Sequence, residues 1–157
     1  MIFWFGGLSN SLSKRFSEMR LILYKILFIM YMVVLFGLMV LTINPGEIDI
    51  PIQLLGIELD KLVHFTLFFP YSIFAWLAFG RSSTKKFSNW SFLLIGFSGL
   101  VLASVTEFLQ LLNPNRNFDP KDMLANFIAI IAGTLLITVI SISKKYFRTI
   151  YVRSGRL

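Results

Sequence analysis

Apolar residues in this chain form four long blocks instead of the alternating or striped patterns typical of half-buried strands and helices. The blocks cover residues 26–43, 62–79, 92–112 and 123–142. Each is long enough to cross a hydrocarbon core about 30 Å thick as a helix that rises about 1.5 Å per residue. Lipid offers no partner to backbone amides, so each block is predicted to be helical. The pattern predicts an all-α fold, an integral membrane four-helix bundle.

The segments that flank the blocks are more polar. Within residues 1–25, apolar side chains recur at helical spacing with charged residues between them: Phe5, Leu8, Leu12, Phe16 and Met19. This pattern favours an amphipathic helix on the inner leaflet, although a frayed tail that supplies positive charge explains it equally well. We therefore expect a cytoplasmic amphipathic segment at 1–25, a transmembrane domain at 26–143 and a basic cytoplasmic tail at 144–157.

Composition and charge support a membrane protein and predict its orientation. Hydrophobic residues make up 56% of the chain and charged residues 15%, which is far from the balance of a soluble domain. Twelve of the fifteen Lys and Arg residues lie before residue 26, between 81 and 89, or after 143, all on one side of the predicted bundle. Positive charge is enriched in cytoplasmic segments, so both termini are predicted to be inside. The net charge of +7 then reflects topology, and we expect no nucleic-acid partner.

Two titratable residues interrupt the apolar blocks near their outer ends. His64 lies in the second block and Glu107 in the third. Further polar residues are predicted at a similar depth on three helices, namely Asp60, Lys61, Gln110, Arg116, Asp119, Asp122 and Asn126. Ala103 shares a helix face with Glu107, and Gly133 shares one with Asn126. Small residues mark the close-packed sides of membrane helices, so these polar groups are predicted to point into the bundle.

Each of these residues also has a purely structural explanation. Glu107 could be a protonated or ion-paired carboxyl that holds helices together, and His64 could simply hydrogen-bond to Asp60. Intramembrane acids cost roughly 3 kcal/mol or more at the bilayer centre, which favours a functional reading of Glu107. Asn126 is harder to explain away, because an amide inside an apolar helix needs hydrogen-bond partners.

The charged residues near the outer connections have simpler explanations still. Asp119 and Asp122 surround Pro120, which is the arrangement of a helix start: a capping Asp, a first-turn proline and an acid at the positive end of the helix dipole. Lys61 and Arg116 could be ordinary charges of the outer connections. A structural network between helices therefore stays open beside any functional site.

The order and spacing of the polar residues resemble the VanZ-like membrane protein family. The pattern is D-K-x-x-H-F, then E-x-x-Q, then R-x-x-D-x-x-D-x-x-x-N-x-x-x-x-x-x-G; here it comprises Asp60, Lys61, His64, Phe65, Glu107, Gln110, Arg116, Asp119, Asp122, Asn126 and Gly133. The resemblance covers about residues 26–143. It implies a multi-pass protein of the bacterial cytoplasmic membrane, from a family named for low-level resistance to the glycopeptide teicoplanin. It implies no known reaction.

Two functions remain open on these residues. In the first, an outward-facing polar pocket binds a lipid or cell-wall head group, with Lys61 and Arg116 pairing with phosphate or carboxylate, and this binding influences glycopeptide susceptibility. In the second, Glu107 and His64 act as an acid–base pair of an enzyme that modifies a lipid-linked envelope substrate. We rank catalysis second, because the chain carries no nucleophile motif and no phosphate-binding glycine loop.

The expected partners are the bilayer itself and a lipid-linked or cell-wall ligand, and self-association stays open. No cofactor is expected. One histidine with scattered acids is a weak metal site, so no metal is expected either.

Overall fold

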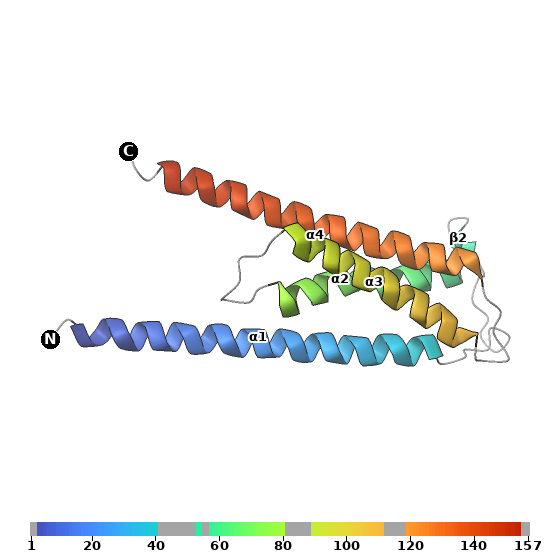
Figure 1. The fold of residues 1–157 in the computed structure, drawn as a ribbon, viewed down its shortest axis with the longest axis horizontal. Coiled ribbons are helices and arrows are strands. Elements are labelled where there is room, and N and C mark those ends of the chain that lie inside the picture. Colours follow the sequence, from blue (N-terminus) through green and yellow to red (C-terminus); the bar gives the residue numbers. More distant parts are fainter. Residues whose placement is uncertain (1–2, 41–52, 55–56, 81–88, 112–118, 155–157) are drawn as a thin grey trace.

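The computed structural model describes residues 3–40, 53–54, 57–80, 89–111 and 119–154. Four helices account for nearly all of them: α1 (Phe3–Val40), α2 (Leu59–Phe79), α3 (Asn89–Gln110) and α4 (Pro120–Ser154). All four are long and apolar enough to cross a membrane. The helices run side by side along one long axis, which confirms the predicted all-α four-helix fold (Figure 1).

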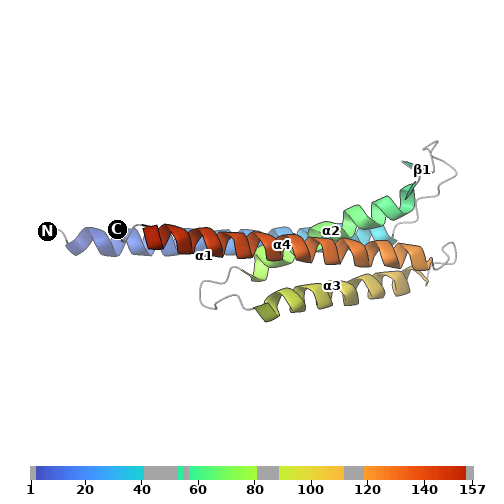
Figure 2. The same cartoon turned by 90° about the horizontal axis from the view of Figure 1, so that it is seen from above.

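Two of the helices are much longer than the apolar blocks that predicted them. α1 begins at Phe3, well before the block at 26–43, and α4 continues to Ser154, past the end of the block at 123–142. Their extensions project beyond α2 and α3 at the same end of the bundle (Figures 1 and 2). Hydropathy marks the part of a helix that matches lipid, whereas backbone hydrogen bonding continues through the polar flanks. That residues 1–25 lie along the membrane surface remains a prediction.

A small hairpin precedes α2 at the opposite end. Its strands are β1 (Gln53–Leu54) and β2 (Ile57–Glu58), paired antiparallel with Gln53 opposite Glu58. These strands lie in the connection between the first two predicted helices, where the apolar pattern predicts no strand. Because α2 starts at the next residue, the hairpin fixes Glu58 beside the first turn of the helix.

Small residues bring α2, α3 and α4 close together. A Cβ atom built on Gly133 of α4 would lie 2.6 Å from the backbone oxygen of Phe69 in α2. One built on Gly99 of α3 would lie 2.9 Å from side-chain atoms of both Tyr71 and Ile130. Side chains at these positions would push the helices apart. The small residues therefore mark the helix-packing faces, as the sequence predicts.

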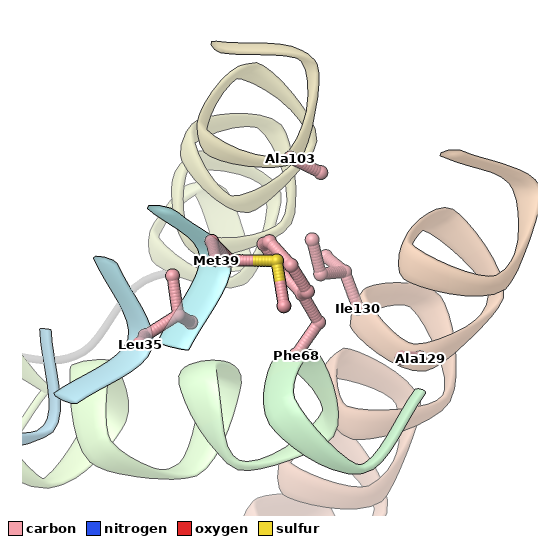
Figure 3. Close-up of a cluster of buried hydrophobic side chains, with 6 residues drawn as sticks. All are labelled: Leu35, Met39, Phe68, Ala103, Ala129 and Ile130. Carbon is pink, nitrogen blue, oxygen red and sulfur yellow. The ribbon is translucent and has the colours of Figure 1, made fainter. Parts of the chain in front are cut away.

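The apolar core lies between all four helices. Its buried members are Leu35 and Met39 from α1, Phe68 from α2, Ala103 from α3, and Ala129 and Ile130 from α4. Figure 3 shows the Phe68 ring reaching into the space between the helices, with Met39 and Ile130 beside it. Phe68 and Ile130 lie one helical turn after His64 and Asn126, and Ala103 lies one turn before Glu107. The apolar core thus lies one helical turn deeper in the bundle than the polar residues.

The outer surfaces of the helices remain strongly apolar. Side chains such as Val33, Phe108 and Val139 are 66%, 72% and 60% exposed. Such exposure would be costly in water but matches hydrocarbon, as expected for helices that face lipid. At the end where the termini lie, the ammonium of Lys144 lies 5.5 Å from the ring centre of Trp76, an aromatic–cation pair typical of a membrane interface.

Candidate functional site

Three helices bring a histidine, an asparagine and a glutamate together in the interior. The Asn126 amide donates a 2.7 Å hydrogen bond to Oε1 of Glu107, and its carbonyl oxygen lies 3.1 Å from Nδ1 of His64. The same imidazole nitrogen is 3.4 Å from Oε1 of Glu107. All three residues are at least 98% buried. The polar groups predicted from three separate helices therefore do meet, and they face each other instead of lipid.

His64, Asn126 and Glu107 form a triad that satisfies the hydrogen-bonding groups of the buried Asn126 amide. An unsatisfied polar group in a low-dielectric interior costs about 1 to 3 kcal/mol, and more if it is charged. Asn126 avoids this cost, because its N–H group donates a hydrogen bond to Glu107 and its oxygen accepts one from His64. It therefore links the third and second helices through the fourth. With both neighbours of Nδ1 being acceptors, the imidazole carries its proton on Nδ1.

The second ring nitrogen of His64 points toward two aspartates nearer the end of the bundle. Nε2 lies 3.7 Å from Oδ1 of Asp60, one turn earlier on α2, and 3.9 Å from Oδ2 of Asp122 on α4. The side chain of Asp60 is 55% exposed, whereas that of Asp122 is 10% exposed. Side-chain exposure thus increases across the site, from buried Glu107 to the solvent-accessible carboxylate of Asp60.

Lys61 is surrounded by carboxylates. Its ammonium forms ion pairs with Glu58, with Asp119 at 3.0 Å and with Asp122 at 3.3 Å. In the binding hypothesis drawn from the sequence, Lys61 pairs with an anionic group of the ligand. The structure instead gives this lysine three anionic partners from the protein, so an outside phosphate or carboxylate would have to compete with them.

Asp119 has the capping role that its position before Pro120 predicts. Its Oδ1 accepts a 2.9 Å hydrogen bond from the backbone N–H of Lys121, in the first turn of α4. That bond, together with the nearby Lys61 ammonium, holds the pKa of the Asp119 carboxyl below its usual value. Asp119 therefore both starts α4 and ties it to α2.

Two predicted site residues stand apart from this arrangement. The Gln110 amide nitrogen lies 3.4 Å from the backbone oxygen and 3.2 Å from the sulfur of Met39, so it ties α3 to α1. A separation of three residues turns Gln110 by about 60° from Glu107 around the helix, enough to reach a different neighbour. Arg116 lies outside the described residues.

Glu58 is a member of the cluster that the sequence reasoning did not select. It pairs with Lys61 three residues later, and its other oxygen lies 4.0 Å from the ammonium of Lys121. The signal was present, because an acid three residues before a lysine at a helix start is a familiar ion-pair spacing. The apolar pattern does not reveal it, because Glu58 lies before the second apolar block, which begins at residue 62.

An apolar groove on the outer face of α3 does not coincide with these residues. The groove measures about 300 Å³ and is lined by Ser104, Val105, Phe108 and Leu109. None of the predicted site residues lines it. The polar residues instead pack directly against one another at the end of the bundle.

The fold and this cluster define a multi-pass α-helical membrane protein with a buried polar triad beneath a carboxylate-rich end. A comparison with protein families matches residues 2–141 to the VanZ/LLP1 family, and the chain belongs to that family. No curated protein and no solved structure gives a significant match. The family assignment rests on most of the chain and confirms the resemblance drawn from the polar residues.

Proposed function

We propose that this VanZ/LLP1 family member binds the polar head group of an envelope lipid or lipid-linked cell-wall precursor at the carboxylate-rich end of its bundle. The observation that carries the proposal is the buried triad of His64, Asn126 and Glu107, which opens through Nε2 of His64 toward half-exposed Asp60. Intramembrane titratable groups with an accessible opening are a functional arrangement by default.

The proposal places this end on the outside of the bacterial cytoplasmic membrane. The opposite end carries the basic extensions of α1 and α4, with Lys14, Arg15, Lys144 and Lys145 among them. Cytoplasmic segments of membrane proteins are enriched in Lys and Arg. The ligand would then be reached from the outer leaflet, where cell-wall intermediates and externally added glycopeptides are present.

Charge favours particular chemical groups on the ligand. The described end gathers four carboxylates, Glu58, Asp60, Asp119 and Asp122, and two lysines, Lys61 and Lys121. These oxygens accept hydrogen bonds, so they suit amino and hydroxyl groups of a sugar or peptide head group. Arg116 remains the candidate for pairing with a phosphate or carboxylate on the same ligand.

An effect on teicoplanin-type susceptibility follows if the ligand is a cell-wall precursor. Occupying or redistributing such a precursor at the outer leaflet would change how much of it a glycopeptide can reach. The resistance role that the resemblance implies would then result from lower access of the glycopeptide to this precursor.

A membrane-embedded enzyme is the second candidate. The supporting observation is that Glu107 and Asn126 hold one imidazole nitrogen while the other faces the accessible end. An imidazole oriented in this way can transfer a proton to or from a lipid-linked substrate, with Glu107 fixing its tautomer. Binding is favoured over catalysis because the cluster presents no activated nucleophile.

Mass spectrometry of lipids retained by the purified protein tests the proposal. Wild type should retain a defined envelope lipid, and Asp60→Asn and Glu107→Gln should lose at least about tenfold of it, consistent with a polar contact worth about 1.4 kcal/mol or more. Glu18→Gln makes the same chemical change on the N-terminal half of α1, away from the carboxylate-rich end, and should retain the lipid. Equal retention by all four proteins would contradict the binding site.

The same experiment separates binding from catalysis. A lipid that is chemically altered in wild-type cells and unaltered in Glu107→Gln cells would favour the enzyme. Unaltered lipid bound by wild type would favour binding. Circular dichroism and yield in detergent must first establish that each variant is folded.

A further inference from the structure

Nε2 of His64 points toward the carboxylates of Asp60 and Asp122. One ligand atom each from Asp60, His64 and Asp122 can be chosen so that all three lie within 4.8 Å of one another. Nε2 is 3.7 Å from Asp60 and 3.9 Å from Asp122, too far for a direct hydrogen bond to either. The three groups therefore face each other without a direct hydrogen bond from Nε2 to either carboxylate.

The contacts of the two ring nitrogens assign them different roles. Nδ1 faces two acceptors, the Asn126 oxygen at 3.1 Å and Oε1 of Glu107 at 3.4 Å, so the proton of a neutral imidazole belongs there. Nε2 then turns its lone pair toward two carboxylate groups. A cation between these three groups would offset the repulsion among their electron pairs.

We propose that Asp60, His64 and Asp122 bind a divalent metal ion, with zinc the best match to their chemistry. Imidazole nitrogen and carboxylate oxygen are both ordinary zinc ligands, at about 2.0 to 2.2 Å from the ion. Two such ligands at a tetrahedral angle lie roughly 3.4 Å apart. The observed 3.7 and 3.9 Å separations require an inward movement of a few tenths of an ångström.

The surroundings of the three ligands resemble those of metal-binding histidines in general. A ligating imidazole usually donates its other N–H to an oxygen acceptor, which fixes the ring and its tautomer. Asn126 and Glu107 supply that support here. Three protein ligands leave at least one coordination position open, as in zinc sites that bind water or substrate.

The charge of the neighbouring carboxylates and the solvent exposure of Asp60 also favour a bound cation. Glu58, Asp119 and one oxygen of Asp122 face the ammonium of Lys61, which leaves Oδ2 of Asp122 directed at His64. The half-exposed Asp60 provides the route for an ion to enter.

This inference differs from the expectation drawn from sequence and does not depend on the head-group proposal. Along the chain, Asp60 and His64 make an ordinary one-turn pair, and Asp122 is far away. Packing of α4 against α2 adds the third ligand.

The single histidine of the chain allows a direct test by nitrogen NMR. Protein labelled with ¹⁵N-histidine and carrying a histidine-free purification tag should give one pair of imidazole nitrogen signals, with the proton on Nδ1. Adding zinc should shift the Nε2 signal until one equivalent is bound, while Nδ1 stays protonated. An Nε2 signal that zinc leaves unchanged in folded protein, or an imidazole protonated on both nitrogens and insensitive to zinc, would overturn the proposal.

Matched variants then test the carboxylate ligands by competition titration with a zinc-binding dye. Asp60→Asn removes a proposed ligand at a half-exposed position that should tolerate the change, and zinc affinity should fall by at least about tenfold. Glu58→Gln removes the same charge from the same end without removing a ligand, so its affinity should stay within about threefold of wild type. Equal losses in both variants would show that the charge of the cluster, and not a three-residue site, attracts zinc, which would overturn the proposal.

Discussion

The amide of Asn126 donates a 2.7 Å hydrogen bond to Glu107 while its oxygen accepts from His64, so one side chain on α4 connects the polar residues of α2 and α3. This connection lies directly above the apolar core, in a layer where water cannot easily replace a missing partner.

Removing the connecting amide should destabilise the bundle. Asn126→Ala removes the buried hydrogen bond to Glu107 and the contact with His64, and we expect a loss of about 1 to 3 kcal/mol in the free energy of unfolding, measured in mixed detergent micelles. Glu107→Gln keeps the shape and should cost less. Wild-type stability in Asn126→Ala would show that the amide has no structural role.

The contact between α2 and α4 should not tolerate a side chain at Gly133. A Cβ there would meet the Phe69 carbonyl oxygen at 2.6 Å, and backbone atoms cannot easily move away. Gly133→Ala should therefore lower stability by about 1 to 3 kcal/mol. In Gly37→Ala the new methyl group meets nothing within 4 Å, so that variant should match wild type or gain up to about 1 kcal/mol. Equal stabilities for the two variants would contradict the close packing.

Phe68 should be the most sensitive core residue beneath the site. It is fully buried between all four helices, and truncation leaves a cavity that its neighbours cannot fill (Figure 3). Phe68→Ala should cost about 3 to 5 kcal/mol in the same unfolding assay. Phe108→Ala, at a position 72% exposed toward lipid, should change stability by less than about 0.5 kcal/mol.

The lowered pKa of Asp119 makes a small, signed contribution to the pH dependence of stability. A carboxyl whose folded-state pKa lies below its ordinary value of 3.8 stabilises the fold above that pH and loses the contribution as pH falls through the folded-state pKa. Between about pH 6 and about pH 3, wild type should therefore lose more thermal stability than Asp119→Asn, which keeps a capping side chain but cannot titrate. Identical losses would remove Asp119 from the acid response.

The cysteine-free chain allows a clean test of orientation. Lys121→Cys places a thiol at the exposed start of α4, and Thr149→Cys places one on its exposed basic extension. A membrane-impermeant maleimide should label the first variant in intact cells and the second only after the membrane is opened. The reverse pattern would place the polar cluster in the cytoplasm and would contradict the proposed access from outside.

The sequence predicts those features of the fold that one physical constraint dominates. Lipid leaves an unpaired backbone no alternative to a helix, so apolar blocks predict the number and order of the membrane helices. The regular rise of a helix then fixes depth, which is why His64, Glu107 and Asn126 could be placed near one level before any packing was known. Hydropathy does not locate the helix ends, because the polar flanks of α1 and α4 remain helical outside the apolar blocks.

What the sequence by itself determined is therefore the membrane class, the four helices, the family pattern and the depth at which polar groups gather. Tertiary structure decided which groups touch. It turned Gln110 toward Met39, gave Lys61 three acidic partners and brought Asp122 to His64. These outcomes depend on the rotation of each helix about its own axis and on the hairpin before α2. Such rotations are set by many small packing contacts, among them the close approach at Gly133, and these are properties of the assembled bundle that no single segment encodes.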